Sequence, residues 1–356
     1  MAKLGEICAF QSGGTPSKNK PEYFGGEIPW ISTTALNGGK INEADAVAWI
    51  TPKAIRESAA KIVPANSIMI GTRVGIGKVA INTVEMSTSQ DVISLINIDE
   101  DKWYKPYLCK LLLSKKDYFN SQARGATIKG IKIDVVANID VPEIDYATQR
   151  KVAATLSKID TLIVLRKQQL AKLDELVKAR FVEMFGDVLL NSMQWPEKTL
   201  ESMADIVSGI TKGRKTAEAD LQEVPYMAVS NVKDGYIDWT TVKTILATRQ
   251  EIEQYRLMPD DILMTEGGDP DKVGRGAIIK VPLKNSIHQN HIFRVRLDKS
   301  ELLPAYFAEY LQHQKAKRYF LGCAKQTTGI ASINMRQLRA LPVLIPPLPL
   351  QNQFAA

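Results

Sequence analysis

Six short segments combine glycine with lysine or arginine and with polar side chains, and they carry most of the residues that could do chemistry. Glycine allows close approach to the backbone, lysine and arginine neutralise phosphate, and asparagine, glutamine or threonine can bond to base edges. The segments are residues 13–20, 72–78, 124–132, 211–215, 267–275 and 325–329. Any one of them could be an ordinary solvated turn, whereas the matched set favours contact with DNA.

The candidate DNA contacts are eleven of the basic side chains of these segments, together with one asparagine. They are Lys18, Lys20, Arg73, Lys78, Arg124, Lys129, Lys212, Arg214, Lys215, Arg275, Asn290 and Lys325. The formal net charge of +7 agrees with a polyanionic partner, although many basic proteins have no such partner.

Catalytic motifs for DNA chemistry are missing from the sequence. It contains no NPPY-like tetrapeptide, no glycine-rich cofactor loop after a strand and no GxSxG nucleophile motif. Residues 71–81 lack the spacing of a phosphate-binding loop and have Val79 where a hydroxyl is needed. His288 and His291 have no third ligand for zinc, so we interpret them as a polar strand edge near DNA. We therefore expect a binding protein without metal or cofactor, rather than an enzyme that combines recognition with catalysis.

The three cysteines, Cys8, Cys109 and Cys323, have neither an even number nor metal-binding spacing. We expect reduced core thiols. The N-terminus has no apolar run of signal-peptide length, and no stretch of 18 apolar residues occurs. The expected location is the cytoplasm.

The two halves of the chain resemble each other at an offset of about 200 residues, too long for a solenoid repeat. Short β-branched runs separated by Gly, Pro and Asn indicate strands and turns in each half, followed by helices that begin near Pro106 and Pro304. The aligned pairs are Pro29 with Pro225, Pro64 with Pro259, Gly75 with Gly274, Gln90 with Gln289, Pro106 with Pro304, Ile133 with Ile333, and Gln149 with Gln351. The prediction is a duplicated, sheet-rich α+β domain.

A single long helix is predicted between the copies, from Asp145 as N-cap to Gly186 just beyond its end. Apolar residues three and four apart form a heptad seam, typical of a coiled coil. The residues expected to face a partner helix are Leu156, Ile159, Ile163, Leu170, Leu173 and Val177. The alternative is a helix that packs only on its own domains. Two similar domains held apart by a rigid helix suit duplex DNA, because a fixed distance along the duplex corresponds to a fixed rotation about its axis.

The same series of features occurs in both halves, with the heptad helix between them, and this arrangement resembles the specificity subunit of type I restriction–modification systems. The strings that carry the resemblance are the strand after a Gly-rich entry, the VGxG hairpin, the ELVKARFVEMFGD end of the helix and the LPVLIPPLPLQNQFAA exit. The resemblance implies a target recognition domain at 1–144, a conserved helix at 145–185, a second target recognition domain at 186–344 and the start of a second conserved helix at 345–356.

The resemblance also implies what the chain does. Each domain would read one half of a bipartite DNA target, and the paired helices would dock methyltransferase subunits and, through them, restriction subunits. S-adenosylmethionine, ATP and magnesium would be used by those partners in adenine methylation and ATP-dependent cleavage. Because only the first turn of the second helix is present, the seam is expected to need a partner from outside. The alternative is a truncated specificity chain that homodimerises to read a symmetric target, or that acts as a regulator or decoy.

Overall fold

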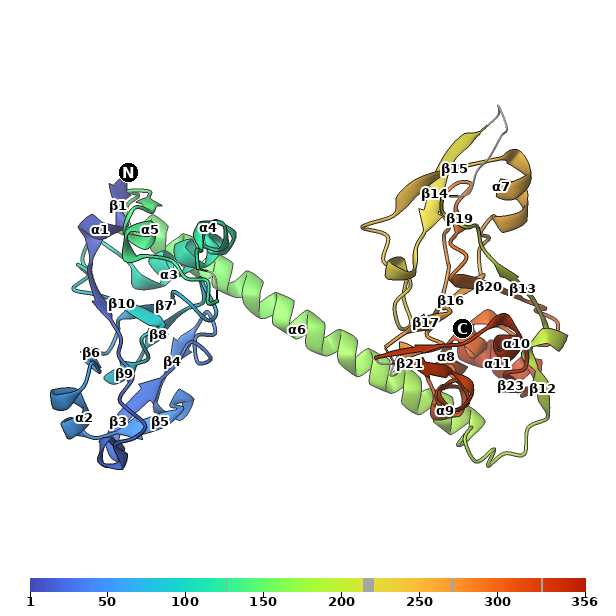
Figure 1. The fold of residues 1–356 in the computed structure, drawn as a ribbon, viewed down its shortest axis with the longest axis horizontal. Helices are drawn as coiled ribbons and strands as arrows, with labels where there is room; N and C mark the ends of the chain where they lie inside the picture. Colours follow the sequence, from blue (N-terminus) through green and yellow to red (C-terminus); the bar gives the residue numbers. More distant parts are fainter. Residues whose placement is uncertain (126, 214–220, 270–271, 328) are drawn as a thin grey trace. The chain divides into compact units, whose positions relative to one another are not determined.

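A computed structural model of the protein describes residues 1–125, 127–213, 221–269, 272–327 and 329–356. The longest element is helix α6, Tyr146–Phe185, with 40 residues (Figure 1). Contacts divide the chain inside this helix, into unit 1 (Met1–Gln168) and unit 2 (Gln169–Ala356). Each unit therefore contains about half of α6. Within the described residues, no helix is long and apolar enough to cross a membrane.

Helix α6 begins and ends at the residues that the sequence predicts. The Asp145 carboxylate accepts a hydrogen bond from the backbone N–H of Thr148 (2.9 Å), which satisfies a donor that the first turn leaves open. At the other end Gly186 has φ +73°, and its N–H donates to the Val182 carbonyl. Glycine adopts this left-handed conformation without a steric cost, so it stops the helix there.

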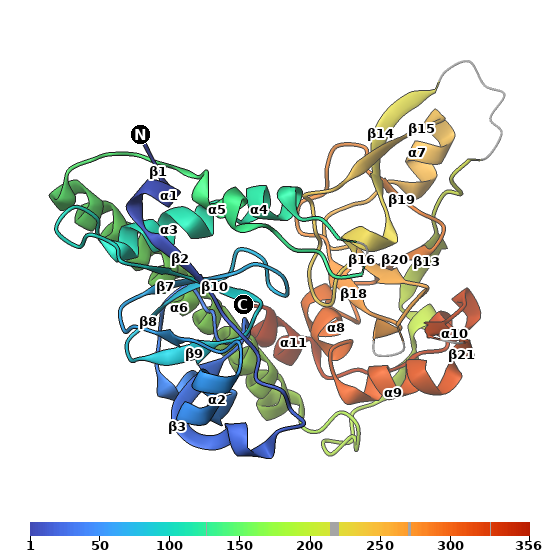
Figure 2. The same cartoon turned by 60° about the vertical axis from the view of Figure 1, so that its left-hand side comes forward.

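Unit 1 is built on a five-stranded sheet in the order β2-β10-β7-β8-β4. The strands are β2 (Ala9–Ser12), β10 (Val92–Ile96), β7 (Ile68–Gly71), β8 (Val79–Asn82) and β4 (Lys40–Ile41). One face packs on helices α3 (Lys105–Ser114), α4 (Lys116–Gln122) and α5 (Ile133–Ala137), as Figure 2 shows. Met69 and Ala80 point to the other face, which packs on a second sheet. Both faces are thus buried, which explains the nearly continuous apolar runs of β7 and β8.

Unit 2 repeats this sheet in the order β13-β20-β16-β18. The strands are β13 (Ala204–Ser208), β20 (Ile292–Leu297), β16 (Ile262–Thr265) and β18 (Gly276–Ile278). Helices α8 (Pro304–Tyr310), α9 (Gln314–Cys323) and α10 (Met335–Arg339) follow in the positions of α3, α4 and α5. The last turns of α6 pack into this core through Phe181, Met184 and Phe185. The predicted duplication of an α+β domain is confirmed by this shared order of strands and helices.

A second small sheet occurs in each unit and contains one parallel pair. In unit 1, β3 (Phe24–Ile31) lies between β5 (Ala48–Ile50) and β9 (Met86–Thr88), followed by β6 (Ile62–Val63). In unit 2, β14 (Gln222–Met227) lies between β15 (Lys243–Ala247) and β19 (Ile287–His288). The β3–β9 and β14–β19 pairs are parallel, whereas β3–β5 and β14–β15 are antiparallel.

The strand registers correct several residue pairs of the sequence alignment. In the two parallel ladders Thr88 and His288 occupy the same position, so Gln90 matches Asn290 rather than Gln289. The predicted pair was wrong because sequence similarity alone leaves the position of a gap in a short loop uncertain by one residue, whereas the hydrogen bonds of the ladders fix which residues are equivalent. The strand registers keep Pro29 with Pro225 but match Pro64 with Met258 instead of Pro259. Equivalent hydrogen bonds match Pro106 with Ala305 instead of Pro304, and Ile131 instead of Ile133 with Ile333.

The predicted pairing of Gly75 with Gly274 was also wrong, by two residues. The register of the β7–β8 and β16–β18 hairpins makes Gly77, not Gly75, the equivalent of Gly274. Both have positive φ, +74° and +70°. A Cβ on Gly77 would lie 3.3 Å from the Phe119 ring, and one on Gly274 would lie 2.2 Å from the Phe320 ring. Each glycine therefore permits a turn and leaves room for a buried phenylalanine, Phe119 in unit 1 and Phe320 in unit 2.

A buried glutamine joins each unit to the helix that follows it. Gln149 accepts from the backbone N–H of Tyr104 (2.9 Å) and donates to the carbonyls of Lys102 (3.0 Å) and Ile144 (2.9 Å). Gln351, on helix α11 (Leu348–Ala355), makes the same three bonds in unit 2, with Leu303 (2.8 Å), Glu301 (3.0 Å) and Pro346 (2.8 Å). The predicted match of Gln149 with Gln351 is confirmed, and α11 is the counterpart of the first turns of α6.

In unit 1, α6 is also fastened to helix α3 by an ion pair. The Lys110 ammonium lies 2.5 Å from the Asp160 carboxylate, and the Lys110 side chain is largely buried. The repeat places Glu309 of α8 at the position of Lys110, one turn before His313. The charge at this position is therefore opposite in the two units.

Candidate nucleic-acid interface

In unit 1 the sheet brings four loops to one edge through backbone hydrogen bonds. The N–H of Thr72, after β7, donates to the Asp91 carbonyl before β10 (2.8 Å). The N–H of Ile131 donates to the Thr72 carbonyl (2.8 Å), which adds the loop before α5. Gly14, after β2, donates to the Thr88 carbonyl (2.9 Å). Residues from four distant parts of the sequence are therefore neighbours at this edge.

Unit 2 uses the same bonds at the same edge. The N–H of Glu266 donates to His291 (3.0 Å), and the N–H of Ile333 donates to Glu266 (2.8 Å). Ile210 donates to His288 (2.9 Å), as Gly14 does to Thr88. Strand β17 (Gly267–Gly268) then pairs with β22 (Ile330–Ser332), which pairs with β21 (Lys325–Thr327). Both units thus present four equivalent loops.

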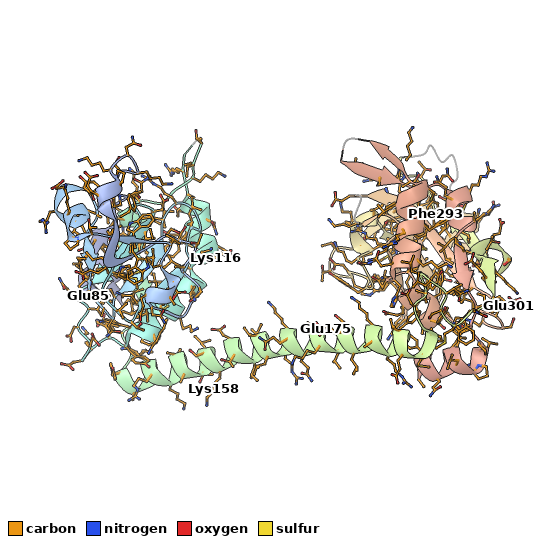
Figure 3. The ribbon with its side chains drawn as sticks, turned by 90° about the horizontal axis from the view of Figure 1, so that it is seen from below. Glu85, Lys116, Lys158, Glu175, Phe293 and Glu301 are labelled. Atoms are coloured by element: carbon orange, nitrogen blue, oxygen red, sulfur yellow. The ribbon has the colours of Figure 1, made fainter. Side chains whose placement is uncertain are left out.

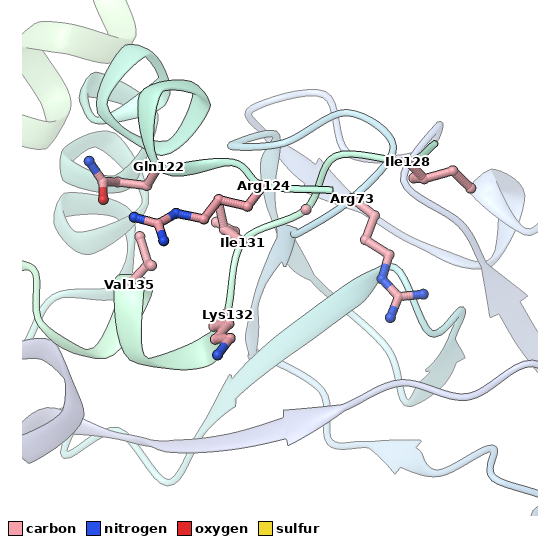
Figure 4. Close-up of a pocket in the computed structure, with 8 residues that line it drawn as sticks. Arg73, Gln122, Arg124, Ile128, Ile131, Lys132 and Val135 are labelled. Atoms are coloured by element: carbon pink, nitrogen blue, oxygen red, sulfur yellow. The ribbon is translucent and has the colours of Figure 1, made fainter. Parts of the chain in front are cut away.

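Four of the predicted contacts of unit 1 come together at this edge: Arg73, Lys78, Arg124 and Lys129. They line two adjoining hollows of about 510 and 600 Å³, and all four side chains are exposed. Figure 4 shows Arg73, Arg124 and Lys132 around the first hollow, with the Arg73 and Arg124 guanidinium groups pointing to opposite sides. The arrangement suits a polyanion, because cations line both hollows and can neutralise several phosphates.

Two further cations at this edge were not among the predicted contacts. Lys132 lines the first hollow and Lys116, at the start of α4, lines the second. Lys132 belongs to the basic segment 124–132, so composition could have identified it. Lys116 comes from a helix, and only the tertiary fold, through the close approach of Gly77 to α4, brings it to the loops.

An acidic side chain accompanies the cations in both units. Arg73 lies 3.8 Å from Asp91 in unit 1. In unit 2 the residue equivalent to Asp91 is His291, whose Nδ1 lies 2.5 Å from the carboxylate of Glu266. Such exposed pairs contribute little to stability.

In unit 2 the structure places Asn290 beside Ile210, since the N–H of Asn290 donates to the Ile210 carbonyl (3.0 Å). Arg275 is half-buried, and its carbonyl accepts from Thr265 beside Glu266 (3.1 Å). Lys325 begins the β21–β22 hairpin and Lys212 follows Ile210, both exposed. Arg214 and Lys215 lie outside the described residues. Within the described part, unit 2 gathers fewer cations than unit 1.

Lys18 and Lys20 are exposed but belong to a different part of unit 1. The Lys20 ammonium donates to the Tyr23 hydroxyl (2.8 Å), and this bond raises the pKa of the lysine. Tyr23 belongs to the cluster around β3, β5 and α2 (Pro52–Glu57). The structure therefore does not bring Lys20 to the edge that carries Arg73.

His288 corrects the prediction of a polar strand edge. Its side chain is fully buried, with Nδ1 3.3 Å from the Tyr255 carbonyl and Nε2 3.3 Å from the Val207 carbonyl. Burial lowers the pKa of His288 to about 4, because the charged ring would lose its hydration. His291 is exposed at the loop edge. The two histidines differ because His288 lies on the buried strand β19, whereas His291 lies in the loop that follows it.

The residues of α6 that were predicted to face a partner helix are exposed in the described structure. The exposed fractions of these side chains range from 40% for Leu156 to 61% for Leu170. Leu162, Val164, Leu165 and Leu176 are exposed as well, so the apolar surface is broader than the predicted seam. Figure 3 shows this stretch of the helix, between Lys158 and Glu175, with its side chains projecting outward. Met184, which fits the heptad, is instead buried in the core of unit 2.

The chain matches a known family along most of its length. The sequence model of the type I restriction modification DNA specificity domain matches residues 1–175 and again residues 193–356. The type I restriction enzyme MjaIX specificity subunit of Methanocaldococcus jannaschii is 26% identical over 99% of this chain and 84% of its own length. The EcoKI specificity subunit of Escherichia coli K12 is 21% identical over 92% of this chain and 74% of its own length.

Solved structures agree in fold. The S subunit of a type I restriction-modification system from M. genitalium superposes with a TM-score of 0.56 over 99% of this chain and 86% of that one, at 15% identity. A chain from a structural study of complex assembly and conformational transition of the type I R-M system gives 0.53 over 99% and 87%, at 18% identity. With two matches of the family model, one for each unit, this protein belongs to the family of type I restriction modification DNA specificity domains.

Proposed function

We propose that the protein is the DNA sequence-recognition subunit of a type I restriction–modification complex. Unit 1 reads one half of a bipartite target and unit 2 reads the other. The observation that carries this proposal is the repeated edge, where equivalent hydrogen bonds gather four loops in each unit and exposed basic side chains lie on some of these loops. Relatives named as specificity subunits support it over nearly the whole chain.

The two units suit a divided target because each has its own sheet and its own core. A unit with a complete core can hold its loops in place without help from the other. Basic side chains supply contacts with phosphate, which position a reader on the duplex, while polar and apolar groups of the same loops supply contacts with base edges. Two such readers on one chain require two half-sites at a defined spacing.

Catalysis in this proposal belongs to partner subunits. The exposed apolar face of α6 docks methyltransferase subunits, and restriction subunits join through them. S-adenosylmethionine, ATP and magnesium are used by those partners in adenine methylation and DNA cleavage. In the described part of the chain, no three His, Cys, Asp or Glu side chains are grouped as metal ligands.

Sequencing the methylated bases of the source cell tests the proposal. We expect a bipartite motif with a fixed gap that disappears when the gene is deleted and returns with the intact gene. A gene carrying Arg73→Ala and Arg124→Ala together should restore methylation more weakly. Unchanged methylation after deletion would refute the assignment. If the chain instead homodimerised to read its target, the motif would be symmetric and light scattering would give twice the chain mass.

A further inference from the structure

A large apolar side chain stands among the cations of unit 1. Ile128 is 63% exposed, and it lines both hollows at the loop edge. It belongs to a short hairpin that is closed by two backbone bonds between Arg124 and Gly130, each 2.9 Å. The base of this hairpin rests on Arg73, because a Cβ on Gly130 would lie 3.0 Å from the Arg73 side chain. Figure 4 shows Ile128 at the far side of the loop from Gln122.

Unit 2 has isoleucine at the same position. The bonds from Ile131 to Thr72 and from Ile333 to Glu266 make Ile131 and Ile333 equivalent. Three residues before each of them is an exposed isoleucine, Ile128 and Ile330, the latter 56% exposed. The residues around Ile330 differ from those around Ile128: Lys129 is matched by the buried Ala331. The isoleucine is thus kept in two loops whose other residues have changed.

An exposed isoleucine gives nothing to phosphate binding, which depends on charge and hydrogen bonding. Single apolar residues on a surface are common, but here the same residue recurs at the edge that carries the basic loops. Among the groups at a base edge in the major groove, the C5-methyl of thymine is the apolar one. A stiff β-branched side chain loses little conformational freedom when it packs against such a methyl.

We propose that Ile128 and Ile330 are specificity-determining residues that pack against a thymine methyl in the first and second half-site, respectively. The inference rests on the proposed function and deepens it, since it assigns the contacted chemical group. Each half-site must then contain an A·T pair at the contacted position. The basic neighbours, including Arg124 and Lys325, hold the loop on the phosphates and do not themselves need to distinguish sequences.

The test uses the full chain and duplexes that carry the target found by methylation mapping. Ile128→Ala should lower affinity for the target about tenfold, with affinity for unrelated duplex and its salt dependence unchanged, because a fully buried isoleucine contact is of this size. Replacing the contacted thymine by uracil should cost the wild-type chain about fourfold, the effect of one methyl group, and cost Ile128→Ala nothing further. Ile330→Ala should behave in the same way at the other half-site.

Val47→Ala in unit 1 and Val281→Ala in unit 2 are matched controls, because both valines are exposed and lie outside the four loops. They should leave affinity unchanged. If no thymine in either half-site shows a uracil effect that depends on the isoleucine, or if Ile128→Ala weakens all duplexes equally, the inference is wrong. If the wild-type chain does not distinguish the target from unrelated duplex, the proposed function itself fails, so the two failures are separable.

Discussion

At the scale of single residues, the two buried glutamines show how one side chain can set the start of a helix. Gln149 satisfies three backbone groups from three places in unit 1: the loop before α3, its N-terminus, and the chain entering α6. An isosteric apolar residue would fill the space and leave one N–H and two carbonyls without partners. Gln351 has the same role in unit 2.

Gln149→Leu is expected to destabilise unit 1 by about 3 kcal/mol, since each backbone group left unsatisfied costs about 1–3 kcal/mol and some gain water. Gln351→Leu should destabilise unit 2 similarly. Urea denaturation followed by tryptophan fluorescence measures both. Gln168→Leu is the matched control, since Gln168 is exposed on the same helix, and it should change the midpoint little. Equal midpoints for Gln149→Leu and Gln168→Leu would contradict the role assigned to the glutamine.

His288 predicts a stability that depends on pH. Its pKa is lowered to about 4 in the folded state by burial, so the unfolded chain, with the ordinary value of about 6.5, binds a proton first as pH falls. The stabilisation is therefore complete above pH 6.5 and decreases as pH falls toward 4, by about 3 kcal/mol in total.

His288→Thr, which installs the residue found at the equivalent position of unit 1, should remove this part of the pH dependence. The measurement is the difference in unfolding free energy between wild type and variant at pH 7.5, 6 and 5, since other groups titrate equally in both. A difference that does not change with pH would show that His288 is not buried in its neutral form.

At the scale of elements, α6 combines two buried ends with an exposed apolar middle. Ala153 packs in the core of unit 1, while Phe181 and Phe185 pack in that of unit 2. Between them Ile163, Leu170 and Val177 are exposed. A contiguous exposed apolar surface of this kind marks an interaction site, because its burial releases free energy in proportion to area.

The partner helix is expected to come from a second copy of the chain or from a methyltransferase subunit. Leu170→Ser together with Leu173→Ser should then abolish self-association in light scattering, or capture of methyltransferase subunits, and leave both units folded. Val281→Ala serves as the exposed control. Hydrogen exchange along residues 156–177 should slow when the partner is bound. A monodisperse monomer whose helix amides exchange rapidly with and without methyltransferase would refute this expectation.

The sequence predicted the elements of this fold better than their residue-by-residue correspondence. The α6 boundaries were predicted because Asp145 and Gly186 are local signals, and short β-branched runs indicated that each half contains strands such as β7 and β20. Pairings such as Gly77 with Gly274 could not be predicted, because they follow from the registers of the β7–β8 and β16–β18 hairpins, which the glycine-rich strings do not reveal. The buried position of His288 likewise depends on carbonyls far from it in sequence.

The candidate site shows the same division. Composition identified the basic loops, since glycine and cations cluster within a few residues. Only the sheet, through bonds such as Ile131 to Thr72, determined which loops share an edge, and it separated Lys20 from Arg73. Lys116 has no local signal, because nothing in its own helix indicates that the loop of Gly77 approaches it.

At the scale of the whole molecule, two complete units predict a division of labour. Arg124→Ala or Lys78→Ala should weaken protection of the first half-site alone, and Lys212→Ala or Lys325→Ala should affect the second alone. Footprinting on the full target, with base changes introduced separately in each half, measures this. Replacing a contact to phosphate should also lower the slope of log affinity against log salt by about 1. A variant in one unit that relaxed both half-sites equally would contradict independent reading.

The intact chain is expected to bind DNA with strong salt dependence and to bind no S-adenosylmethionine. Its net charge of +7 and the cations at the loop edges release counterions from DNA on binding, so affinity should fall steeply between about 50 and 200 mM salt. Titration calorimetry with S-adenosylmethionine should give no heat of binding, and nuclease assays should show no cleavage. Saturable binding of the cofactor by the pure chain would overturn the assignment of catalysis to partner subunits.

The opposite charges at Lys110 and Glu309 have a consequence for how such a duplicated chain reaches its native state. Two sheets with the same strand order on one polypeptide invite exchange of equivalent segments during synthesis and refolding, a characteristic error of repeated domains. If α8 docked where α3 belongs, Glu309 would face the Asp160 carboxylate, and like charges would replace the native ion pair. The opposite charges of the two copies thus discourage misassembly between them. A variant that carries the same charge at both positions should refold with a lower yield.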